Sequence, residues 1–423
     1  MKRTELFTKT SKTAPADEVA KNAQLLIRAG FIHKEMSGVY AYLPLGLRVL
    51  EKIKNIVREE MNAFGSQEIM MTVLQSSELW EKTDRWDSEK VDIWFKTELS
   101  NGGKLGLAPT HEEPIVAAVR NYLNSYKDLP FSVYQIQTKF RNELRAKSGL
   151  LRGREFIMKD MYSFARNQAE HEEIYEHVAK SYEKIYERLG IGDITVRTKA
   201  DGGVFTRQFS DEYQMLSDTG EDTIYIDQEK GLAINREILT DKNLEKVGLK
   251  RESLVEKRAI EVGNIFPLES KYTDALDVYY SDQNGEQKQI IMGCYGIGVS
   301  RLMGAIAEVF SDDCGLVWPE NIAPFQVCLI QIGEDEDVKL AAKKLYQDLQ
   351  DRKIEVLWDD RDSARPGEKF ADADLMGIPH RVVISAKTLD QNRIEYKSRQ
   401  SDTTEMLTVE NLFVKLGKQS ITR

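Results

Sequence analysis

The sequence predicts an α+β fold: a mostly antiparallel sheet with flanking helices over residues 1–322, followed by a small α/β domain over residues 323–423. Extended stretches at 131–143 and 154–164 flank the polar arm LRAKSGLLRG, a pattern typical of two antiparallel strands. The second domain instead alternates strand and helix, which favours a mostly parallel layer. The length of 423 residues suits two or three domains.

The first domain is predicted to begin with two amphipathic helices. Apolar residues recur at helical spacing in both, and Gly65 ends the second. A polar loop over 109–113 then opens a helix in which Pro114 takes the first position. The predicted elements before the arm are helices over 16–30 and 47–64, a strand over 67–74, a hairpin over 91–99 and 104–107, and the helix from Pro114.

Beyond the arm, a charged helix is followed by a segment with weak patterning. This segment, 206–262, predicts a small insertion (about 206–260) or a loop-rich connection. The string GCYGIGVSRLMGAIAEVF predicts a glycine-rich turn that runs into a helix. The other predicted elements are helices over 168–189, 335–350, 368–376 and 408–417, and strands over 260–266, 275–282, 288–294, 326–332, 354–358, 381–385 and 393–397.

Composition excludes several classes of protein. The net charge of −10, from 59 basic and 69 acidic residues, argues against a nucleic-acid partner held by a broad basic face. Three cysteines without C-x-x-C spacing exclude a disulfide framework and a thiolate zinc cluster. The sequence has neither an apolar signal-peptide core nor an apolar run long enough to span a membrane. We therefore expect a cytoplasmic protein without membrane contact.

One stretch departs from the acidic average. Between Lys139 and Arg166 there are eight basic residues and three acidic ones. A solvated face is the ordinary explanation for such a run. Here, however, apolar residues such as Phe140 and Leu150 are interleaved with the arginines, which predicts a half-buried sheet. Arginines in that setting need anions, so the stretch predicts an anion-binding site.

Four residues of this stretch have the chemistry of a nucleotide grip. Arg141 can clamp a phosphate with a bidentate fork, and Arg152 offers a second positive charge. Glu143 can accept a hydrogen bond from an exocyclic amine, and Phe156 offers a stacking face for a purine. The four together form a specific signal, although each alone would be unremarkable.

The glycines of GCYGIG are a weaker signal. Their order does not fit a dinucleotide-binding fingerprint and no βαβ unit precedes them, which excludes a dehydrogenase. Packing of a helix on a strand is an alternative explanation for them. Arg301, one turn into the following helix, strengthens the case for a phosphate site because its guanidinium could reach the rim of that site.

Several strings resemble known signatures. KFRNELRAKSGLLRGREFIMKDMYSF is similar to the second signature of class II aminoacyl-tRNA synthetases, and GCYGIGVSRLMGAI is similar to the third. YAYLPLGLRVLEKIKNIVREEM resembles the first, dimer-forming signature. LAPTHEEP and GEKFADADLMGIPHRVVI resemble bacterial prolyl-tRNA synthetases in particular. The resemblance extends over nearly the whole chain.

The resemblance implies a class II catalytic domain with a seven-stranded antiparallel sheet, an anticodon-binding domain at the C-terminus, and a homodimer. It implies that L-proline attacks the α-phosphate of ATP, giving prolyl-adenylate and pyrophosphate. The prolyl group then passes to the 3′ end of tRNA(Pro), with release of AMP. The apolar face of the helix over 47–64 could equally be core, so it does not decide on dimerisation.

The resemblance also implies roles in adenylation, a step that needs no side-chain base because the nucleophile is already a carboxylate. Arg141 and Arg301 are the expected catalytic residues: Arg141 holds the α-phosphate and the substrate carboxylate, and Arg301 holds outer phosphates. Mg²⁺ is expected to bridge the phosphates, with Glu261 as its protein ligand. The expected ATP-binding residues are Arg141, Glu143, Arg152, Phe156, Glu261, Asn264 and Arg301.

For proline, the resemblance implies a polar end and an apolar wall. Thr110 and Glu112 are expected to take the secondary ammonium, although a helix cap also explains this pair. Cys294 is expected in the wall, although a small buried residue beside glycines is an equal alternative. The expected proline-binding residues are Thr110, Glu112, Arg141, Met158, Tyr162, Phe266 and Cys294.

In the last domain, acidic residues slightly outnumber basic ones, so recognition of an anticodon would depend on local pairs and stacked bases. A core aromatic and a surface turn residue are equally good explanations of Phe370 and Arg365. The residues that match the anticodon-reading face of the family are Asp360, Arg361, Arg365, Lys369 and Phe370.

The chain also departs from the family. The interval from Arg166 to Glu261 is too short for the large editing domain of many bacterial members, so we predict no hydrolysis of mischarged alanyl-tRNA in cis. Leu268-Glu269 replaces a familiar Leu-Gly. The same residues bear on two alternative functions. A synthetase for threonine, glycine or histidine is disfavoured by Thr110-x-Glu112, and a non-catalytic relative is disfavoured because the arginines of the grip are all present.

Overall fold

The computed structural model describes residues 1–419, and the chain forms two compact units. One unit contains Met1–Glu35, Tyr40–Lys52 and the chain from Ile306 onward. The other contains Met36–Val39 and Ile53–Ala305. We call them the smaller and the larger unit.

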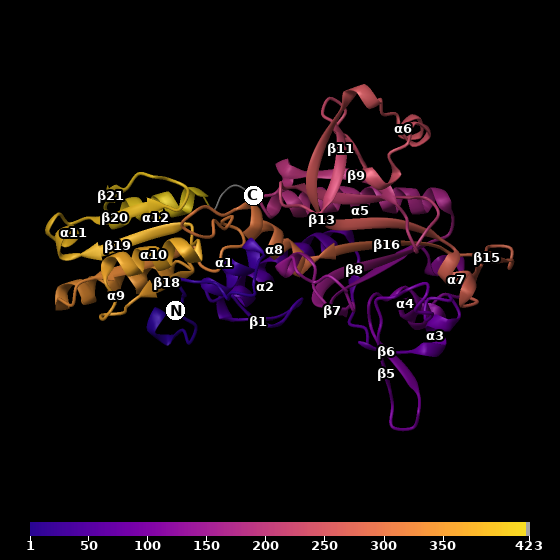
Figure 1. Cartoon of the computed structure of the whole chain (residues 1–423), viewed down its shortest axis with the longest axis horizontal. Helices are drawn as coiled ribbons and strands as arrows, with labels where there is room; N and C mark the ends of the chain where they lie inside the picture. The colour runs from indigo at the N-terminus through magenta and orange to yellow at the C-terminus, as the bar shows by residue number, and fades with distance from the viewer. Residues whose placement is uncertain (420–423) are drawn as a thin grey trace. The chain divides into compact units, whose positions relative to one another are not determined.

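A nine-stranded sheet forms the body of the larger unit (Figure 1). Most neighbouring strands are antiparallel, whereas β12 pairs with β9 and β3 with β7 in parallel. The antiparallel sheet with flanking helices is confirmed, but it has nine strands rather than seven. Its order is β10 (Phe209–Leu216), β9 (Thr195–Asp201), β12 (Leu232–Asn235), β11 (Asp222–Asp227), β13 (Leu254–Glu269), β16 (Ile291–Gly298), β8 (Glu155–Ala165), β7 (Phe131–Phe140) and β3 (Gln67–Glu68).

The strands on either side of the arm pair as predicted. β7 and β8 are antiparallel, with Phe131 opposite Phe164 and Lys139 opposite Phe156. Helix α5 (Gln168–Arg188), predicted over 168–189, packs against β8, β13 and β16. The opposite face of the same central strands carries the cleft described below.

The sequence suggested a small insertion or a loop-rich connection over 206–262, but the structure shows regular strands there. This segment contributes β10, β11, β12 and most of β13 to the main sheet, together with helix α6 (Asp241–Val247). Its pattern is weak because polar side chains are buried in it: Asp211 and Gln214 on β10 have almost no exposed surface. Asp211 is satisfied by Arg197 and Lys199 on β9, so a polar residue occupies a position where periodicity predicts an apolar one.

The glycine-rich string is also not a turn. Gly293, Gly296 and Gly298 lie on β16, and helix α8 (Val299–Val309) begins directly after it. The glycines are needed because a side chain would clash with neighbouring atoms. A Cβ on Gly296 would lie 2.8 Å from Asn264 Oδ1 on the neighbouring strand. A Cβ on Gly293 would lie 2.2 Å from Tyr295 Oη.

Smaller elements surround the sheet, and several differ from their predicted bounds. Helix α4 begins at Glu112, so Pro114 occupies its third position rather than its first. The strand expected over 67–74 is divided between β3 and β4, and that expected over 275–282 is reduced to β14. These elements are α2 (Pro44–Phe64), which runs into the smaller unit, α3 (Ser77–Glu81), α4 (Glu112–Val119), α7 (Lys271–Ala275), the sheet β4 (Leu74–Ser76), β6 (Lys104–Leu107) and β5 (Phe95–Glu98), and the hairpin β14 (Tyr279–Ser281) and β15 (Gln287–Gln289).

The smaller unit contains the predicted α/β layer. Strand β17 lies parallel to β18 and β19, and β20 and β21 extend the sheet antiparallel. Helices α9 and α12 bury Val338, Leu345 and Leu412 against it. The elements are α1 (Lys21–Arg28), β1 (Ile32–Met36), β2 (Val39–Tyr42), β17 (Val327–Ile332), α9 (Glu336–Asp351), β18 (Val356–Asp359), α10 (Pro366–Met376), β19 (His380–Ser385), α11 (Ala386–Asp390), β20 (Ile394–Ser398), β21 (Glu405–Leu407) and α12 (Val409–Gln419).

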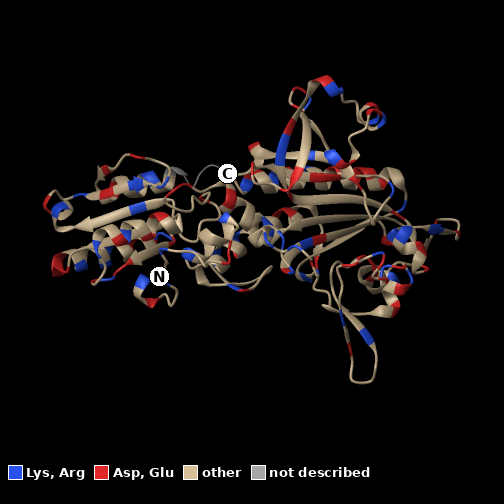
Figure 2. Ribbon diagram, viewed as in Figure 1, with Lys and Arg blue, Asp and Glu red and all other residues tan. Residues whose placement is uncertain are grey.

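Charged residues of both signs alternate along the surface helices (Figure 2). No helix within residues 1–419 is long and apolar enough to cross a membrane.

Candidate active site

A cleft on the central strands brings most of the expected site residues together. It consists of two cavities, with empty volumes of about 680 and 670 Å³, that share Arg141, Glu261 and Arg301 in their walls. The first cavity is lined by Thr110, Glu112, Arg141, Phe156, Met158, Asp160, Phe205, Glu261, Asn264, Phe266, Cys294 and Arg301. The second is lined by Arg141, Glu143, Leu151, Arg152, Glu221, Asp222, Ala259, Ile260, Glu261 and Arg301.

Arg301 is fixed in the wall that the two cavities share. It lies in the first turn of α8, donates from Nη1 to Glu261 Oε2 and to the Glu261 carbonyl at 2.9 Å each, and donates from Nε to the Leu151 carbonyl at 2.8 Å. Asn264 Nδ2 donates to the other oxygen of Glu261 at 2.8 Å. The guanidinium and the carboxylate are therefore oriented before any ligand arrives.

Arg141 is the cation without a counter-ion. It follows β7 directly, donates from Nε to the Pro109 carbonyl at 3.3 Å and lies over the Phe156 ring, 5.2 Å from its centroid. Within residues 1–419 no carboxylate lies within ion-pair distance of it. Burial lowers the pKa of Arg141, and the positive charge of Arg301 lowers it further. A partly buried cation beside a second cation is an arrangement that an anion stabilises.

The second cavity has a polar rim made by the arm. Arg152 Nε donates to Glu143 Oε2 at 3.0 Å, and its Nη1 donates to Glu221 Oε2 at 3.2 Å. Glu221 also accepts from Ser148. Glu143 and Arg152 therefore lie together, as the motif predicts, while Glu221 comes from the turn before β11 and was not anticipated.

The first cavity ends at a buried carboxylate. Glu112 has no exposed surface, and Thr110 Oγ1 lies 2.8 Å from both of its oxygens. The thiol of Cys294 donates to Glu112 Oε1 at 3.2 Å, and burial raises the pKa of that thiol well above its usual value. The helix-cap explanation is wrong, because the N-cap of α4 is His111 and no side chain caps it.

Tyr162 lies behind the cavity rather than among the residues that line it. Its hydroxyl donates to Asp160 Oδ2 at 2.8 Å and accepts from the backbone N–H of His111 at 3.1 Å. Lys139 Nζ donates to the other oxygen of Asp160 at 2.7 Å, and Gln135 Nε2 donates to Oδ2 at 2.8 Å. This buried network supports the floor of the cavity.

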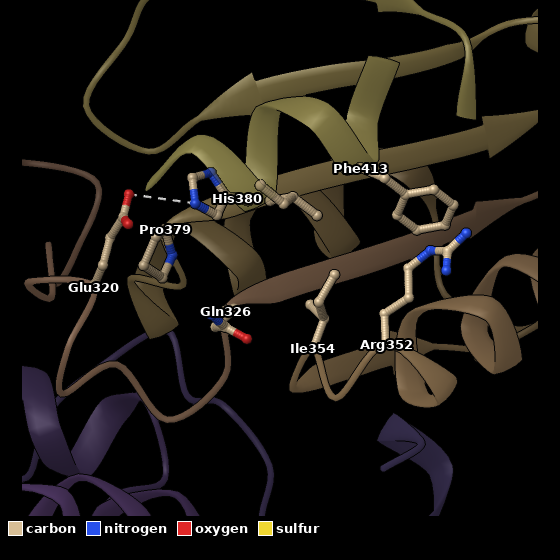
Figure 3. A pocket seen from close by; sticks show the side chains of 9 residues that line it. Glu320, Gln326, Arg352, Ile354, Pro379, His380 and Phe413 are labelled. Atoms are coloured by element: carbon tan, nitrogen blue, oxygen red, sulfur yellow. Dashed lines mark ion pairs between the residues drawn. The ribbon is translucent and has the colours of Figure 1, made fainter. Parts of the chain in front are cut away.

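A third cavity lies in the smaller unit, where the strands β17, β18 and β19 begin (Figure 3). Its polar groups already have partners. His380 Nε2 lies 3.3 Å from Glu320 Oε1, and His380 Nδ1 lies 2.9 Å from Tyr396 Oη. The guanidinium of Arg352 lies over the Phe413 ring, 4.1 Å from its centroid. The lining of this third cavity lacks the pair of arginines beside a carboxylate that distinguishes the cleft.

Comparison with protein families agrees with this geometry. The description "tRNA synthetase class II core domain (G, H, P, S and T)" matches residues 95–310, and "Anticodon binding domain" matches residues 326–419. The proline–tRNA ligase of Anaplasma phagocytophilum is 36% identical over 99% of this chain and 100% of its own length. That of Rickettsia akari is 38% identical over 96% of this chain and 98% of its own length. This chain belongs to the proline–tRNA ligase family.

Proline–tRNA ligases differ in length. The Bacillus cytotoxicus relative is 32% identical over an alignment of 562 residues that covers 97% of this chain and 98% of its own, so it contains a long stretch without a counterpart here. A solved prolyl-tRNA synthetase from Cryptosporidium parvum, complexed with L-proline and AMP, has the same fold. It has a TM-score of 0.75 and 17% identity, and covers 94% of this chain and 77% of its own.

The five residues expected to read the anticodon lie where β18 ends and α10 begins. Arg361 donates to Asp359 Oδ2 at 2.6 Å and to Asp372 Oδ2 at 2.9 Å. Asp360 accepts two hydrogen bonds from Thr4, at 3.0 and 2.8 Å. Both are therefore engaged inside the unit.

The remaining three differ in exposure. Lys369 is buried and donates to the Gln331 carbonyl at 2.7 Å, so it braces the sheet. Arg365 is the exposed N-cap residue of α10. Phe370 is partly buried beneath the guanidinium of Arg381, which lies 4.7 Å from the ring centroid.

Sequence reasoning missed several residues of the cleft wall, among them Asp160, Phe205 and Glu221. Asp160 lies between Met158 and Tyr162 on β8, and the period of two along a strand places all three on one face, so the pattern could have revealed it. Phe205 comes from a loop without a regular pattern and packs on Phe266, with ring centroids 4.8 Å apart. Glu221 likewise had no signal in the sequence.

Proposed function

We propose that this chain activates L-proline with ATP, giving prolyl-adenylate and pyrophosphate, and then transfers the prolyl group to the 3′ end of tRNA(Pro), releasing AMP. The observation that carries the proposal is the single cleft with a buried carboxylate, Glu112, at one end and the Glu143–Arg152 pair at the other. Arg141 lines both cavities, so one guanidinium can contact both substrates.

Adenylation follows from charge and position. The carboxylate of proline is already a nucleophile, so the enzyme must bring it in line with the α-phosphate and stabilise the charge that develops there. Arg141, which lacks a counter-ion, would hold the carboxylate and the α-phosphate together. Arg301 and Arg152 would hold the outer phosphates, and Glu143 with Phe156 would bind adenine.

Recognition of proline would use the first cavity. Glu112, already oriented by Thr110 and Cys294, would accept from the secondary ammonium. Met158 and Phe266 line the same cavity and would contact the apolar ring. Tyr162 would act from behind this wall through its bond to Asp160.

We infer that Mg²⁺ arrives with ATP. Within residues 1–419 no group of three His, Cys, Asp or Glu side chains forms a metal site, and Arg301 and Asn264 each occupy one oxygen of Glu261. This donor set fits an ion held mainly by phosphates, with Glu261 as a single protein ligand, which is common for Mg²⁺. When bound, the ion would neutralise phosphate charge.

The tRNA partner is assigned by domain. We propose that residues 1–322 catalyse the reaction and residues 323–423 read the anticodon. Arg365, which is exposed, and Phe370, whose ring is partly buried, would contact bases. Asp360, Arg361 and Lys369 would hold the surface in shape through their internal bonds. Local contacts of this kind suit single-stranded loops, whose bases can stack on side chains.

A homodimer in the cytoplasm completes the proposal. The apolar face of α2 does not support dimerisation, because Leu50, Ile53 and Val57 are core residues of the chain itself. Support comes from large apolar side chains left exposed nearby in sequence, such as Met70 at 82%. The cysteines are free, as in reducing compartments. Sedimentation that gives only monomer at micromolar concentration would contradict the dimer.

ATP–pyrophosphate exchange tests the function directly. Proline, alanine, threonine, glycine, histidine and cysteine are supplied one at a time with ATP and Mg²⁺. We expect exchange driven mainly by proline. Exchange driven by another amino acid would overturn the assignment of the first cavity, and folded protein that exchanges with none of them would overturn the enzymatic function.

A further inference from the structure

Arg85 is a buried arginine that no motif indicated. It lies after α3, in the region where α3, α4 and α7 lie together beside the sheet (Figure 1). Only 6% of its surface is exposed. Its guanidinium faces the rings of Trp80, Phe205 and Tyr272, at 4.8, 5.0 and 5.5 Å from their centroids. A cation so far from water must be matched by anions.

Two adjacent glutamates provide the match. Arg85 Nη1 donates to Glu112 Oε2 at 3.1 Å and to the two oxygens of Glu113 at 3.1 and 3.0 Å. Both glutamates are fully buried. Thr83 Oγ1 donates to Glu113 Oε1 at 2.6 Å. Glu113 is thus held from the side away from the cavity, whereas Glu112 also contacts Thr110 and Cys294 at the cavity wall.

The charges of this cluster do not cancel. Arg85 and Glu112 alone would form a neutral pair, and a neutral pair attracts an ammonium group weakly. Glu113 adds a second negative charge, so the ionised cluster carries one negative charge more than it has positive ones. That surplus sits at the end of the cavity where the amine of proline is expected to bind.

We propose that Arg85 and Glu113 are positioning residues for the amine of proline. Arg85 fixes the carboxylate of Glu112 at the cavity wall, and Glu113 neutralises Arg85, which leaves the charge of Glu112 for the ammonium. The inference rests on the proposed function, since it concerns the binding of proline in that reaction.

The titration of Glu113 makes the role measurable. Burial raises the pKa of Glu113, Arg85 opposes that rise and the neighbouring Glu112 adds to it, and together these effects place the pKa at about 7. Other titratable groups also act on this cluster. Tyr272 and Lys271 of α7 face all three charges, and the groups around Glu112 are His111, Lys139, Arg141, Tyr162 and Cys294. As pH falls through 7, Glu113 gains a proton and the cluster loses its surplus charge, whereas the amine of proline stays protonated. The KM for proline should therefore rise on the acid side.

Glu113→Gln tests the charge while keeping the shape. Proline-dependent ATP–pyrophosphate exchange is measured at pH 6, 7 and 8, with KM values for both substrates. At pH 8 we expect the KM for proline to rise about ten-fold or more, as for loss of a buried charge interaction, with the KM for ATP unchanged. The variant should also lose the rise in KM between pH 8 and pH 6. A KM for proline like that of the wild type, or a retained pH profile, overturns the proposal.

Two further variants separate positioning from packing. Arg85→Lys keeps the charge but cannot bridge two carboxylates with one planar group, so the KM for proline should rise in it as well. Arg197→Lys is the matched control, because Arg197 pairs with buried Asp211 away from the cleft. An equal rise of KM in this control would show that general sheet packing sets the KM, and would overturn the proposal.

The wild-type protein supplies the last comparison. If it shows no proline-dependent exchange, the proposed function fails, and the inference fails with it. If it exchanges but its KM for proline is flat between pH 6 and pH 8, the inference alone fails. This profile needs no substitution, so it remains decisive even where a variant does not fold.

Discussion

Arg301 Nη1 donates to Glu261 Oε2 at 2.9 Å, a bond that ties the first turn of α8 to strand β13. The two residues lie far apart in sequence, and both line the two cavities of the cleft. Because the backbone carbonyls of Leu151 in the arm and Glu261 on β13 hold the same guanidinium, its direction is set by the fold and not by a ligand. A preorganised cation of this kind stabilises developing charge without reorganising.

Replacing Arg301 by lysine should therefore slow adenylation strongly, even though lysine keeps the positive charge. A lysine cannot make the three bonds of the guanidinium at once, so its ammonium would lose its fixed direction. We expect the rate of proline-dependent exchange to fall by about a hundred-fold, the size seen when one preorganised donor is removed. Steady-state exchange kinetics with varied ATP measure it. Arg166→Lys, which alters an ion pair with Glu170, serves as control and should keep its rate.

Arg141→Ala should abolish adenylate formation and leave the fold intact. The side chain has no carboxylate partner within residues 1–419 and makes one long hydrogen bond, so its removal costs little stability. Its absence leaves both the substrate carboxylate and the α-phosphate unneutralised. Exchange assays measure the loss of adenylate formation, and thermal melting measures whether the fold is intact. Arg145→Ala removes an exposed arginine of the same arm and should retain exchange; near-normal exchange by the Arg141 variant would refute the assignment.

The sequence predicted these arginines because they stand in continuous motifs. Arg141, Glu143, Arg152 and Phe156 lie on one hairpin, where spacing along the chain translates directly into spacing in the site. Arg85 could not be predicted in this way, because its contacts with Glu112 and Glu113 exist only once α3 and α4 pack together.

In the fold, too, features set by local sequence pattern were predicted and features set by long-range pairing were not. The pair β7–β8 and the alternating second domain follow from local pattern and are confirmed. Strands β10, β11 and β12 were missed, and only residues 260–266 of β13 were predicted, because both faces of that part of the sheet bury polar side chains. Glu221 comes from a turn of this region and Phe205 from the turn just before it, so their place in the cleft depends on pairings that local pattern does not reveal.

The cysteines should differ sharply in reactivity. Only the thiolate is a good nucleophile, and burial raises the pKa of Cys328 to about 12 and that of Cys294 well above its usual value. Cys314 is exposed. At pH 8, iodoacetamide should label Cys314 rapidly and the other two slowly, which peptide mass spectrometry measures. Labelling of Cys294 as fast as that of Cys314 would contradict the buried hydrogen bond to Glu112.

Acid should destabilise the larger unit through two buried histidines. Burial lowers the pKa of His171 and of His111 to about 4, against 6.5 for an exposed histidine. The unfolded chain therefore binds these protons first as pH falls. The stability that depends on the neutral rings is complete above pH 6.5 and is lost between pH 6.5 and 4, by up to about 3 kcal/mol for each ring.

His171→Phe tests this account. Neither ring nitrogen of His171 has a hydrogen-bond partner within residues 1–419, so an apolar ring of similar size should be tolerated at pH 8. At pH 5 the variant should be more stable than the wild type in urea unfolding, because it has no proton to gain. Equal loss of stability in both proteins between pH 8 and pH 5 would show that other groups control acid unfolding.

Mischarged alanyl-tRNA should persist in the presence of the pure protein. In this chain the interval between β8 and β13 is used by α5 and by strands of the main sheet, with α6 as its only other helix of more than one turn among the described residues. A second hydrolytic site would need a cavity with its own water-activating groups, and the long stretch in the Bacillus cytotoxicus relative has no counterpart here. We expect deacylation no faster than the spontaneous rate, measured with labelled alanyl-tRNA(Pro) at pH 7.

The Arg141→Ala variant is the control, because it removes adenylate formation but would leave an independent hydrolytic site intact. Rapid deacylation by both proteins would reveal such a site, and rapid deacylation by the wild type alone would place hydrolysis in the cleft itself.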